Sequence, residues 1–424
     1  MRIFYFIGGF KVSVLLLGKG VANDGVELLL KEDNIDYEYL NINEVKSFEY
    51  DYVVKAPGIP YHEEVIKEFV SRNIKIYTDL ELGMKLRDKY YIVVSGSNGK
   101  TTTVSLVYHV LRNIEDVVLC GNIGYSFCKA LVENKKAKTF IVEASSFQLE
   151  NTNIKPNISV LLNINPCHLD HHISFKNYVD SKERITVNQD KESYFIYNLN
   201  DIYIKNIAKK TKAKLISFSN DSVLGKCYIF NGWIYYDNKR IVKLNKNIVE
   251  KEYLLSDYMA AISVLIGSGK IKSSKIRKYI KDFKEINYRL TKVNNFIYND
   301  AKSTNPYSTI AALKCFNNVY LICGGYDRNE NLGCLKSYLH KIKKVYAYGD
   351  TKNKIYNFMS LNNIETEVFN NLDEAFKKSL SDRINEIILF SPMFASYDNF
   401  NNYIERGNFF NELCKKYQNI LEKS

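Results

Sequence analysis

Short apolar runs alternate with turns and amphipathic stretches along most of the chain. The first apolar run predicts a strand at 12–17, and the amphipathic stretch after it predicts a helix at 25–31. A helix is next predicted at 63–72, between strands at 52–54 and 74–77. Such an alternation of strand and helix is typical of an α/β fold that is built on a parallel sheet.

The same alternation recurs in two later stretches. The second stretch contains predicted strands at 90–94, 140–142 and 159–162, a helix at 101–111, and a hairpin whose strands are 227–230 and 233–236. Two-residue hairpin turns prefer the Asn-Gly pair that joins those two strands, so we expect this hairpin at an edge of the sheet. The third stretch contains predicted strands at 319–323, 344–347 and 386–390 and a last helix after residue 398.

The chain length of 424 residues exceeds what a single hydrophobic core usually organises. We therefore predict an α/β protein of three domains, at 1–87, 88–286 and 287–424. The first and third are expected to be Rossmann-like, and the central one to combine a parallel sheet with a small added β-sheet. No flexible Gly/Ser linker separates them, so the domains are expected to abut.

Charge and composition limit the class of partner. Lysine and arginine exceed aspartate and glutamate by 12, which favours anionic ligands. The basic residues are interspersed with acidic ones, so we expect no nucleic-acid partner. No apolar run is long enough for a membrane span, residues 1–10 lack the features of an export signal, and eight cysteines without a CxxC pair indicate reduced thiols. We therefore expect a soluble protein in the cytoplasm.

A glycine turn, Gly18-Lys19-Gly20, follows the first predicted strand. Main-chain amides at the start of a helix can hold a pyrophosphate. However, Asn23 stands where a dinucleotide-binding motif would have its third glycine. An ordinary strand-to-helix turn is the alternative, and these residues taken alone favour it.

A second glycine-rich turn, with the sequence GSNGKTT, lies between a predicted strand and a predicted helix. Glycines let main-chain amides surround phosphate oxygens there, and the helix dipole favours negative charge. Lys100 is expected to contact the β and γ phosphates of ATP, and the Thr101 hydroxyl to bind Mg²⁺. Val94 stands where a strict Walker A motif has glycine, so this is a variant loop. The expected ATP-binding residues are Gly96, Ser97, Asn98, Gly99, Lys100, Thr101 and Thr102.

Polar residues follow the next predicted strands of the central domain. Glu143 ends a strand beside the phosphate loop, where a further Mg²⁺ ligand belongs, although a solvated acid is the alternative for a single glutamate. The segment 165–172 contains three of the six histidines, one of which is expected to face a metal. The spacing supports no tetrahedral zinc site, and Mg²⁺ fits the phosphate loop better. From spacing alone, Lys182 is expected to be a solvated surface lysine.

Polar residues also gather after the predicted strands of the third domain. They lie at 299–306, 324–328 and 391–398, at the carboxyl ends of strands, where open α/β sheets bind ligands. Arg289 lies a little upstream of the first segment. Gly407 falls inside a predicted helix, which indicates close packing at that point.

These segments together resemble the Mur ligase family, and the resemblance covers nearly the whole chain. The family-level segments are GSNGKTT at 96–102, GNIG at 121–124, EASSFQLE at 143–150, NPCHLDHH at 165–172, YVDSKERI at 178–185 and NDAKSTNP at 299–306. Three segments, of which the first lies within 143–150, resemble the members that use D-glutamate. They are SSFQLE at 145–150, GGYDR at 324–328 and SPMFASYDNFNNYIERGNFF at 391–410.

The resemblance implies an ATP-dependent ligase of peptidoglycan precursor synthesis. Its substrates would be D-glutamate and UDP-N-acetylmuramoyl-L-alanine, joined through an acyl phosphate. The first domain would bind the UDP precursor, the second a P-loop-bound ATP, and the third D-glutamate. The implied cofactors are ATP, two Mg²⁺ ions and a carbamylated lysine.

The resemblance also assigns roles to individual residues. The catalytic residues would be Lys100, Glu143, His168 and Lys182. The metal ligands would be Thr101, Glu143, His168 and Lys182 as its carbamate. Further nucleotide contacts would come from Asp257, Arg289 and Asp300, and contacts to the UDP precursor from Gly18, Gly20, Asn23 and Asn122. D-Glutamate would contact Lys302, Thr304, Arg328, Ser396 and Tyr403.

Two alternatives are open at this point. A folylpolyglutamate-type ligase shares the ATP loop and the lysine but adds L-glutamate to a pteridine carrier; the segment at 391–400 argues against it. The other alternative is a non-catalytic ATP-binding regulator. It is open because the stretch 252–257 lacks the His-Asn pair that the family usually carries. Retention of Glu143, His168 and Lys182 favours an enzyme.

Overall fold

The computed structural model describes residues 13–220, 224–249, 251–284 and 286–417. The segment 1–10, for which no export signal is predicted, lies outside these residues. The described residues form two compact units, of which the first comprises those up to 164 with 174–249 and 254–283. The second comprises 165–173, 251–253 and those from 284 onward. Within the described ranges, no helix is long and apolar enough to cross a membrane.

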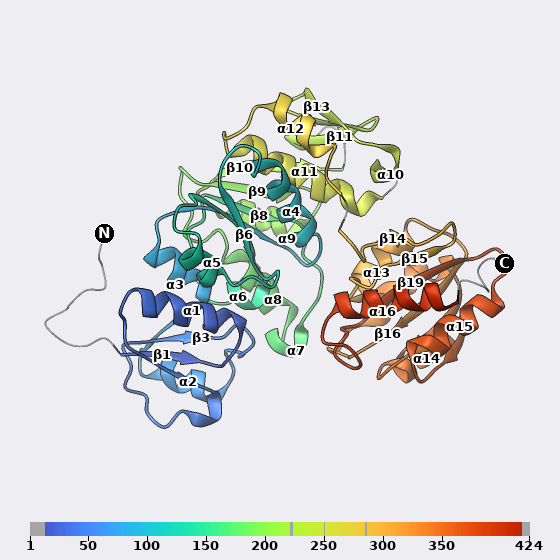
Figure 1. The fold of residues 1–424 in the computed structure, drawn as a ribbon, viewed down its shortest axis with the longest axis horizontal. Helices are drawn as coiled ribbons and strands as arrows, with labels where there is room; N and C mark the ends of the chain where they lie inside the picture. The colour runs from blue at the N-terminus through green and yellow to red at the C-terminus, as the bar shows by residue number, and fades with distance from the viewer. Residues whose placement is uncertain (1–12, 221–223, 250, 285, 418–424) are drawn as a thin grey trace, which may run out of the picture. The chain divides into compact units, whose positions relative to one another are not determined.

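A parallel sheet of four strands, drawn in blue in Figure 1, opens the first unit. Its order β2-β1-β3-β4 places consecutive strands on opposite sides of β1, so the strand order reverses between β1 and β3. Every residue of β1 and β3 is buried, as expected for inner parallel strands. The elements are β1 Val14–Leu17, α1 Val21–Glu32, β2 Tyr37–Leu40, a 3₁₀ helix Ile42–Glu44, β3 Tyr52–Lys55, α2 Glu64–Ser71, β4 Lys75–Tyr77 and α3 Asp79–Leu86.

A second sheet of nine strands, in the order β13-β12-β11-β10-β9-β8-β5-β7-β6, completes the first unit. Strands β5 to β11 are parallel to one another, and β12 and β13 extend the same sheet as antiparallel strands at its edge. The strands are β5 Tyr90–Ser95, β6 Val117–Gly121, β7 Thr139–Glu143, β8 Ile158–Leu161, β9 Tyr194–Asn198, β10 Lys214–Ser219, β11 Cys227–Phe230, β12 Trp233–Tyr236 and β13 Lys239–Lys243. The helices are α4 Lys100–Leu111, α5 Phe127–Glu133, α6 Ser146–Leu149, α8 Phe175–Glu183, α9 Ile202–Ala208, α10 Lys246–Val249, α11 Glu252–Gly267 and α12 Ser273–Ile280.

The predicted hairpin is confirmed, although β13 lies outside it and forms the edge of the sheet. Strands β11 and β12 occupy the predicted residues, and both turn residues, Asn231 and Gly232, have positive φ angles of 48° and 76°. Positive φ at both positions is what a type I′ turn requires. The small β-sheet that the sequence predicts for the central domain is this antiparallel edge of the large sheet.

Two glycines let helices from the two sheets of the first unit lie close together. A Cβ added at Gly25 of α1 would lie 1.9 Å from the Ser126 hydroxyl oxygen, and one at Gly83 of α3 would lie 2.6 Å from the Phe127 ring. Helices α1 and α3 therefore pack directly against α5. This close contact joins the two sheets in one compact unit.

The second unit contains a third sheet, in the order β14-β15-β19-β16-β17-β18 (Figure 1). Only β14 is antiparallel to its neighbour. The elements are α7 Leu169–His172, β14 Thr291–Lys292, β15 Ile297–Asn299, α13 Pro306–Leu313, β16 Val319–Gly324, a 3₁₀ helix Leu332–Lys341, β17 Ile342–Tyr348, α14 Lys352–Ser360, β18 Glu365–Val368, α15 Leu372–Asp382, β19 Ile387–Met393 and α16 Tyr403–Lys416. The close packing predicted at Gly407 is confirmed, because a Cβ added there would lie 2.5 Å from the Tyr288 ring.

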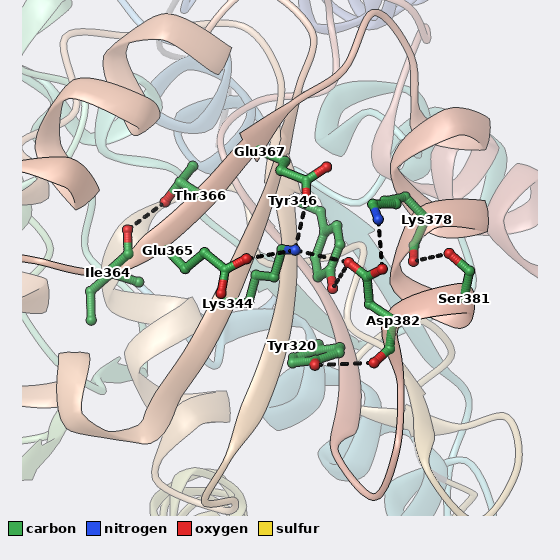
Figure 2. Close-up of polar contacts among 10 residues, drawn as sticks. All are labelled: Tyr320, Lys344, Tyr346, Ile364, Glu365, Thr366, Glu367, Lys378, Ser381 and Asp382. Carbon is green, nitrogen blue, oxygen red and sulfur yellow. Dashed lines mark hydrogen bonds and ion pairs between the residues drawn. The ribbon is translucent and has the colours of Figure 1, made fainter.

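An ion cluster ties β17, β18 and α15 together in this unit. Figure 2 shows the Lys344 ammonium among three carboxylates, at 2.7 Å from Glu365, 2.6 Å from Glu367 and 2.9 Å from Asp382. The Tyr346 hydroxyl and the Lys378 ammonium also contact Asp382. Burial alone would lower the pKa of Lys344, but the hydrogen bonds to its three acids outweigh burial and raise it.

Candidate active site

The phosphate loop connects β5 to α4 in the nine-stranded sheet. Gly99 has a φ of 91°, and a Cβ there would lie 2.1 Å from a carboxylate oxygen of Asp257, so only glycine fits. The Lys100 ammonium donates to the carbonyl oxygens of Gly96, at 2.7 Å, and Ser97, at 3.0 Å. The loop therefore holds its lysine at the start of the helix, where phosphate groups bind in such turns.

An asparagine that the sequence did not single out supports this loop. Asn163 follows β8, and its side-chain oxygen accepts from the Asn98 amide at 2.8 Å while its Nδ2 donates to the Asn98 carbonyl at 3.0 Å. The Asn163 carbonyl also accepts from the Ser97 amide at 2.9 Å. The phosphate loop is thus fastened to the end of the neighbouring strand.

Glu143 ends β7, which is a direct neighbour of β5. Its side chain is 3% exposed, and one carboxylate oxygen accepts from Asn122 Nδ2 at 3.1 Å. The other oxygen is buried and has no hydrogen-bond partner among the described residues. A buried carboxylate oxygen without a donor is costly unless a cation compensates it. Its position at a strand end beside the phosphate loop therefore suits Mg²⁺, which prefers oxygen ligands.

Lys182 is buried, contrary to the expectation from spacing. It is 1% exposed, because Tyr178, Ser181 and Lys182 form the inward face of α8. The Lys182 ammonium donates to the Ser95 hydroxyl at 3.3 Å and lies 4.8 Å from the Tyr178 ring centre. The Tyr178 hydroxyl is in turn 2.7 Å from the hydroxyl of Ser97 in the phosphate loop. Lys182 therefore lies at the end of the strand that leads into that loop.

A cavity of about 480 Å³ opens at the carboxyl end of the first sheet. It lies where the strand order reverses between β1 and β3, the usual ligand position in open α/β sheets. Gly18 and Gly20, which the sequence assigns to the UDP precursor, are part of its wall. The lining residues are Gly18, Lys19, Gly20, Val21, Ala22, Asn41, Ile42, Asn43, Ala56, Pro57, Gly58 and Ile59.

Asn23 is fully buried next to the wall of this cavity. Its Nδ2 donates to the carbonyl oxygens of Leu17 at 3.0 Å, Gly18 at 2.9 Å and Val54 at 3.3 Å. The side chain joins the ends of β1 and β3. Asn23 thus holds Gly18 of the cavity wall in place, but it is not itself one of the residues that line the cavity.

Lys55, which the sequence did not single out, is buried at the end of β3. Its ammonium donates to the carbonyl oxygens of Ile59, at 2.6 Å, and Ala56, at 3.3 Å, both of which line the cavity. Burial lowers the pKa of Lys55 to about 8, although Glu150 and Asp79 act in the opposite direction. Lys55 thus holds the turn that forms one wall of the cavity.

The residues assigned to D-glutamate lie in the second unit. The Lys302 ammonium donates to the Tyr403 hydroxyl at 3.1 Å. The Arg328 guanidinium lies 5.1 Å from the Tyr397 ring centre and 3.5 Å from Nδ1 of His168, which belongs to the same unit. The structure thus brings together Lys302 with Tyr403, and Arg328 with His168. Ser396 is buried and Thr304 is half-buried on neighbouring loops.

Asp300 lies fully inside the second unit, at the end of β15. One of its oxygens accepts from the Leu290 amide at 3.0 Å, and the other accepts from the hydroxyls of Ser303 and Ser391. Burial raises the pKa of Asp300 to about 6, against the effect of these donors and of the Arg289 charge. Asp300 therefore joins three segments of the backbone at this end of the sheet.

The chain is similar in sequence to known proteins. The family model of the Mur ligase middle domain matches residues 94–249. A UDP-N-acetylmuramoylalanine–D-glutamate ligase of Geobacillus sp. (strain WCH70) is 33% identical over 372 residues, 85% of this chain and 82% of that protein. Another, of Caldanaerobacter subterraneus subsp. tengcongensis, is 32% identical over 435 residues, 96% of each.

The fold is also that of a solved structure. The crystal structure of a MurF ligase from Thermotoga maritima in complex with ADP has a TM-score of 0.60 at 14% identity, covering 98% of this chain and 96% of that chain. Such a likeness shows a shared fold. The sequence identity to the two relatives, which extends over most of the chain, shows more: this chain belongs to the Mur ligase family, among the UDP-N-acetylmuramoylalanine–D-glutamate ligases.

Proposed function

We propose that this protein uses ATP to join D-glutamate to UDP-N-acetylmuramoyl-L-alanine, in the cytoplasmic synthesis of peptidoglycan precursors. The proposal depends most on Glu143, whose buried, unbonded carboxylate oxygen lies on the strand beside the phosphate loop. Glu143 together with His168 and Lys182 would make a second metal site, for which a protein that only binds ATP has no need. Both relatives described above are named for D-glutamate, which favours this function over folylpolyglutamate addition.

The residues that we assign to Mg²⁺ are Thr101, Glu143, His168 and carbamylated Lys182. Bound Mg²⁺, two ions in this proposal, would offset the charge of the phosphate oxygens. Lys100 would add a fixed positive charge at the β and γ phosphates. Carbamylation would convert the buried Lys182 ammonium into an anion beside Ser95, at the end of the strand that leads into the loop.

The two carbon substrates have separate assigned positions. The cavity between β1 and β3 would take the UDP end of the precursor, with main-chain amides after Gly18 and Gly20 near its pyrophosphate. The loops with Lys302, Arg328 and Ser396 would take D-glutamate, whose two carboxylates favour the two cations. Further nucleotide contacts are assigned to Asp257, Arg289 and Asp300, and contacts to the muramoyl part to Asn122. The protein would act as a monomer.

The reaction proceeds in two steps. The terminal carboxylate of the precursor attacks the γ-phosphorus of ATP, which forms an acyl phosphate and releases ADP. The amine of D-glutamate then attacks the acyl carbon, the amide bond forms, and phosphate and a proton leave. Both partners of the first step are anions, so Lys100 must reduce their repulsion. Water must be excluded before the second step, because it would hydrolyse the acyl phosphate.

The test is incubation of the purified protein with ATP, Mg²⁺, UDP-N-acetylmuramoyl-L-alanine and each enantiomer of glutamate, followed by mass measurement of the product. We expect an adduct with D-glutamate alone, and ATP hydrolysis that requires both carbon substrates. A product only with L-glutamate and a pteridine carrier would establish the folylpolyglutamate reaction instead. ATP binding without turnover under every condition would identify a regulator.

A further inference from the structure

Three neighbouring loops of the second unit carry the residues that we assign to D-glutamate. They follow β15, β19 and β16, which lie side by side in the sheet. Lys302 and Thr304 follow β15, Arg328 follows β16, Ser396 follows β19, and Tyr403 begins α16. Since these loops are far apart in sequence, their backbones need a common support to present one binding surface.

One buried side chain contacts the backbone of all three loops. Arg406, on α16, is 0% exposed. Its Nη2 donates to the carbonyl oxygens of Ala301 at 3.1 Å and Phe394 at 3.0 Å. Its Nη1 donates to the carbonyl oxygen of Ala395 at 3.2 Å and lies 3.5 Å from that of Gly324.

The acceptors adjoin the assigned substrate residues. Ala301 directly precedes Lys302, and Ala395 directly precedes Ser396. Gly324 ends β16 and opens the turn of the remaining loop. A displacement of the guanidinium would therefore move the substrate side chains of all three loops together.

The partners of Arg406 are unusual for a buried cation. Among the described residues, no carboxylate lies within ion-pair distance of it, and burial lowers the pKa of Arg406 against the opposing effects of Tyr348 and the nearby Asp398. A buried charge without an acid partner costs free energy. The planar fork of a guanidinium can reach four carbonyl oxygens on three segments, which a lysine ammonium cannot reproduce.

The glycine turn after β16 fits tightly against this guanidinium. A Cβ added at Gly325 would lie 2.2 Å from the Ala395 carbonyl oxygen and 3.0 Å from Nη1 of Arg406. The next amide, that of Tyr326, donates to the same Ala395 carbonyl at 2.9 Å. The loops after β16 and β19 are thus fixed to each other beside Arg406.

We propose that Arg406 is a positioning residue for the amino-acid substrate, which holds the three loops so that Lys302, Arg328 and Ser396 face one ligand. Arg406 is fully buried and acts through the backbone carbonyls that it binds. This inference rests on the proposed function, since it takes D-glutamate as the ligand of these loops.

The test compares Arg406→Lys with the wild type in steady-state kinetics for each substrate. We expect the KM for D-glutamate to rise about tenfold, because a lysine ammonium cannot keep all the carbonyl contacts that fix the three loops. The KM values for ATP and the UDP precursor should change by less than about twofold. The acyl phosphate, trapped with hydroxylamine in the absence of D-glutamate, should form at the wild-type rate.

The matched control is Arg383→Lys. Arg383 also donates to a backbone carbonyl, that of Glu386 at 2.9 Å, but just before the start of β19. This variant should keep all three KM values. Equal increases in every KM of Arg406→Lys, or an unchanged KM for D-glutamate, would overturn the inference. An absence of product from the wild type would instead overturn the proposed function.

A second variant covers the case in which Arg406→Lys does not fold. Gly325→Ala perturbs the same contact from the loop side, since its Cβ would meet both Ala395 and Arg406. It should raise the KM for D-glutamate and leave that for ATP unchanged. A folded Gly325→Ala protein with a wild-type KM for D-glutamate would refute the role of Arg406.

Discussion

Lys344 and Arg406 are both buried cations of the second unit, but they have opposite kinds of partner. Lys344, near the amino end of β17, binds three carboxylates within 2.9 Å (Figure 2). Arg406, near the carboxyl ends of β16 and β19, donates hydrogen bonds to backbone carbonyls, and among the described residues no carboxylate lies within ion-pair distance of it. The sheet therefore pairs its cation directly with acids at one end and with carbonyl oxygens at the other.

The two kinds of partner suggest two roles, stability for the cation at the amino ends of the strands and ligand binding for the cation at the carboxyl ends. Ligands of open α/β sheets bind at the carboxyl ends of the strands, and an anionic ligand gains from positive charge there that no protein acid has cancelled. Lys55 has a similar set of partners in the first sheet, where its ammonium donates to carbonyl oxygens beside the cavity while Glu150 and Asp79 act on its charge from further away. We therefore expect changes of the cations at the carboxyl ends to affect turnover, and changes of the cations at the amino ends to affect the free energy of unfolding.

The largest effect is expected for Lys182→Ala, at the carboxyl end of the nine-stranded sheet. Loss of the proposed carbamate should lower kcat/KM by about 10³-fold, or about 4 kcal/mol in the activation barrier. The free energy of unfolding should fall by about 1 kcal/mol or less, because a buried amine is removed along with its cost. Activity assays and urea denaturation measure the two quantities.

Chemical rescue sharpens this prediction. Small carboxylic acids should restore part of the activity of Lys182→Ala, whereas excess bicarbonate should not, since no amine is left to carbamylate. Lys176→Ala, on the exposed face of the same helix, is the matched control and should keep full activity. Unchanged turnover of Lys182→Ala would remove this lysine from the mechanism.

Lys344→Met should lower the free energy of unfolding and leave turnover unchanged, which is the reverse of the effect expected for Lys182→Ala. It leaves three carboxylates without their common partner, and removing one member of a buried ion pair costs about 3 to 5 kcal/mol. Because Glu365 and Glu367 are partly exposed, we expect a loss of about 2 kcal/mol in the free energy of unfolding. The KM and kcat values should stay within about twofold of the wild type.

The control for Lys344→Met is Lys416→Met, which removes an exposed ion pair with Asp373 in the same unit. Exposed pairs contribute little, so its unfolding free energy should change by less than about 1 kcal/mol. An increase in any KM of Lys344→Met without a loss of stability would contradict the separate roles that we assign to the cations at the two ends of the sheet.

Asp300 provides a pH test at the carboxyl end. Its pKa is raised to about 6 by burial, against about 3.9 in an unfolded chain. Between pH 4 and about 6 the folded state therefore keeps a proton that the unfolded state has lost, so stability falls as pH rises through this window. Relative to Asp300→Asn, the wild type should lose about 2 kcal/mol between pH 4 and 7. Parallel stability curves of the two proteins would show that Asp300 titrates normally.

Much of this fold follows from local sequence patterns. The predicted strands occur within a few residues of their positions, and the Asn231-Gly232 hairpin is found where it is predicted. Glycine turns after strands also locate the phosphate loop and the cavity, because the backbone conformation that they require is a local property. The helix predicted to begin at 25 begins at Val21, since Gly25 serves helix packing and does not mark a helix start.

The contacts that support the sites could not be predicted in this way. Asn163, Lys55 and Arg406 act through partners that only the folded chain brings near, such as Ala301, 105 positions before Arg406. Lys182 has the sequence environment of a surface lysine, and only the inward orientation of α8 buries it. Their positions depend on tertiary packing, which hydrophobic periodicity does not specify.

The smallest effect is expected for Ser396→Ala, on the loop that follows β19. Loss of one hydroxyl contact of about 1 kcal/mol should raise the KM for D-glutamate about fivefold and leave that for ATP unchanged. Ser391→Ala is the matched control, because the Ser391 hydroxyl donates to Asp300 at 2.7 Å and so serves the protein interior. It should lower the free energy of unfolding by about 1 kcal/mol without changing the KM for D-glutamate. Equal increases in the KM for D-glutamate and for ATP in Ser396→Ala would refute the assignment of this loop to the amino acid, since a loop that binds only one substrate cannot affect both alike.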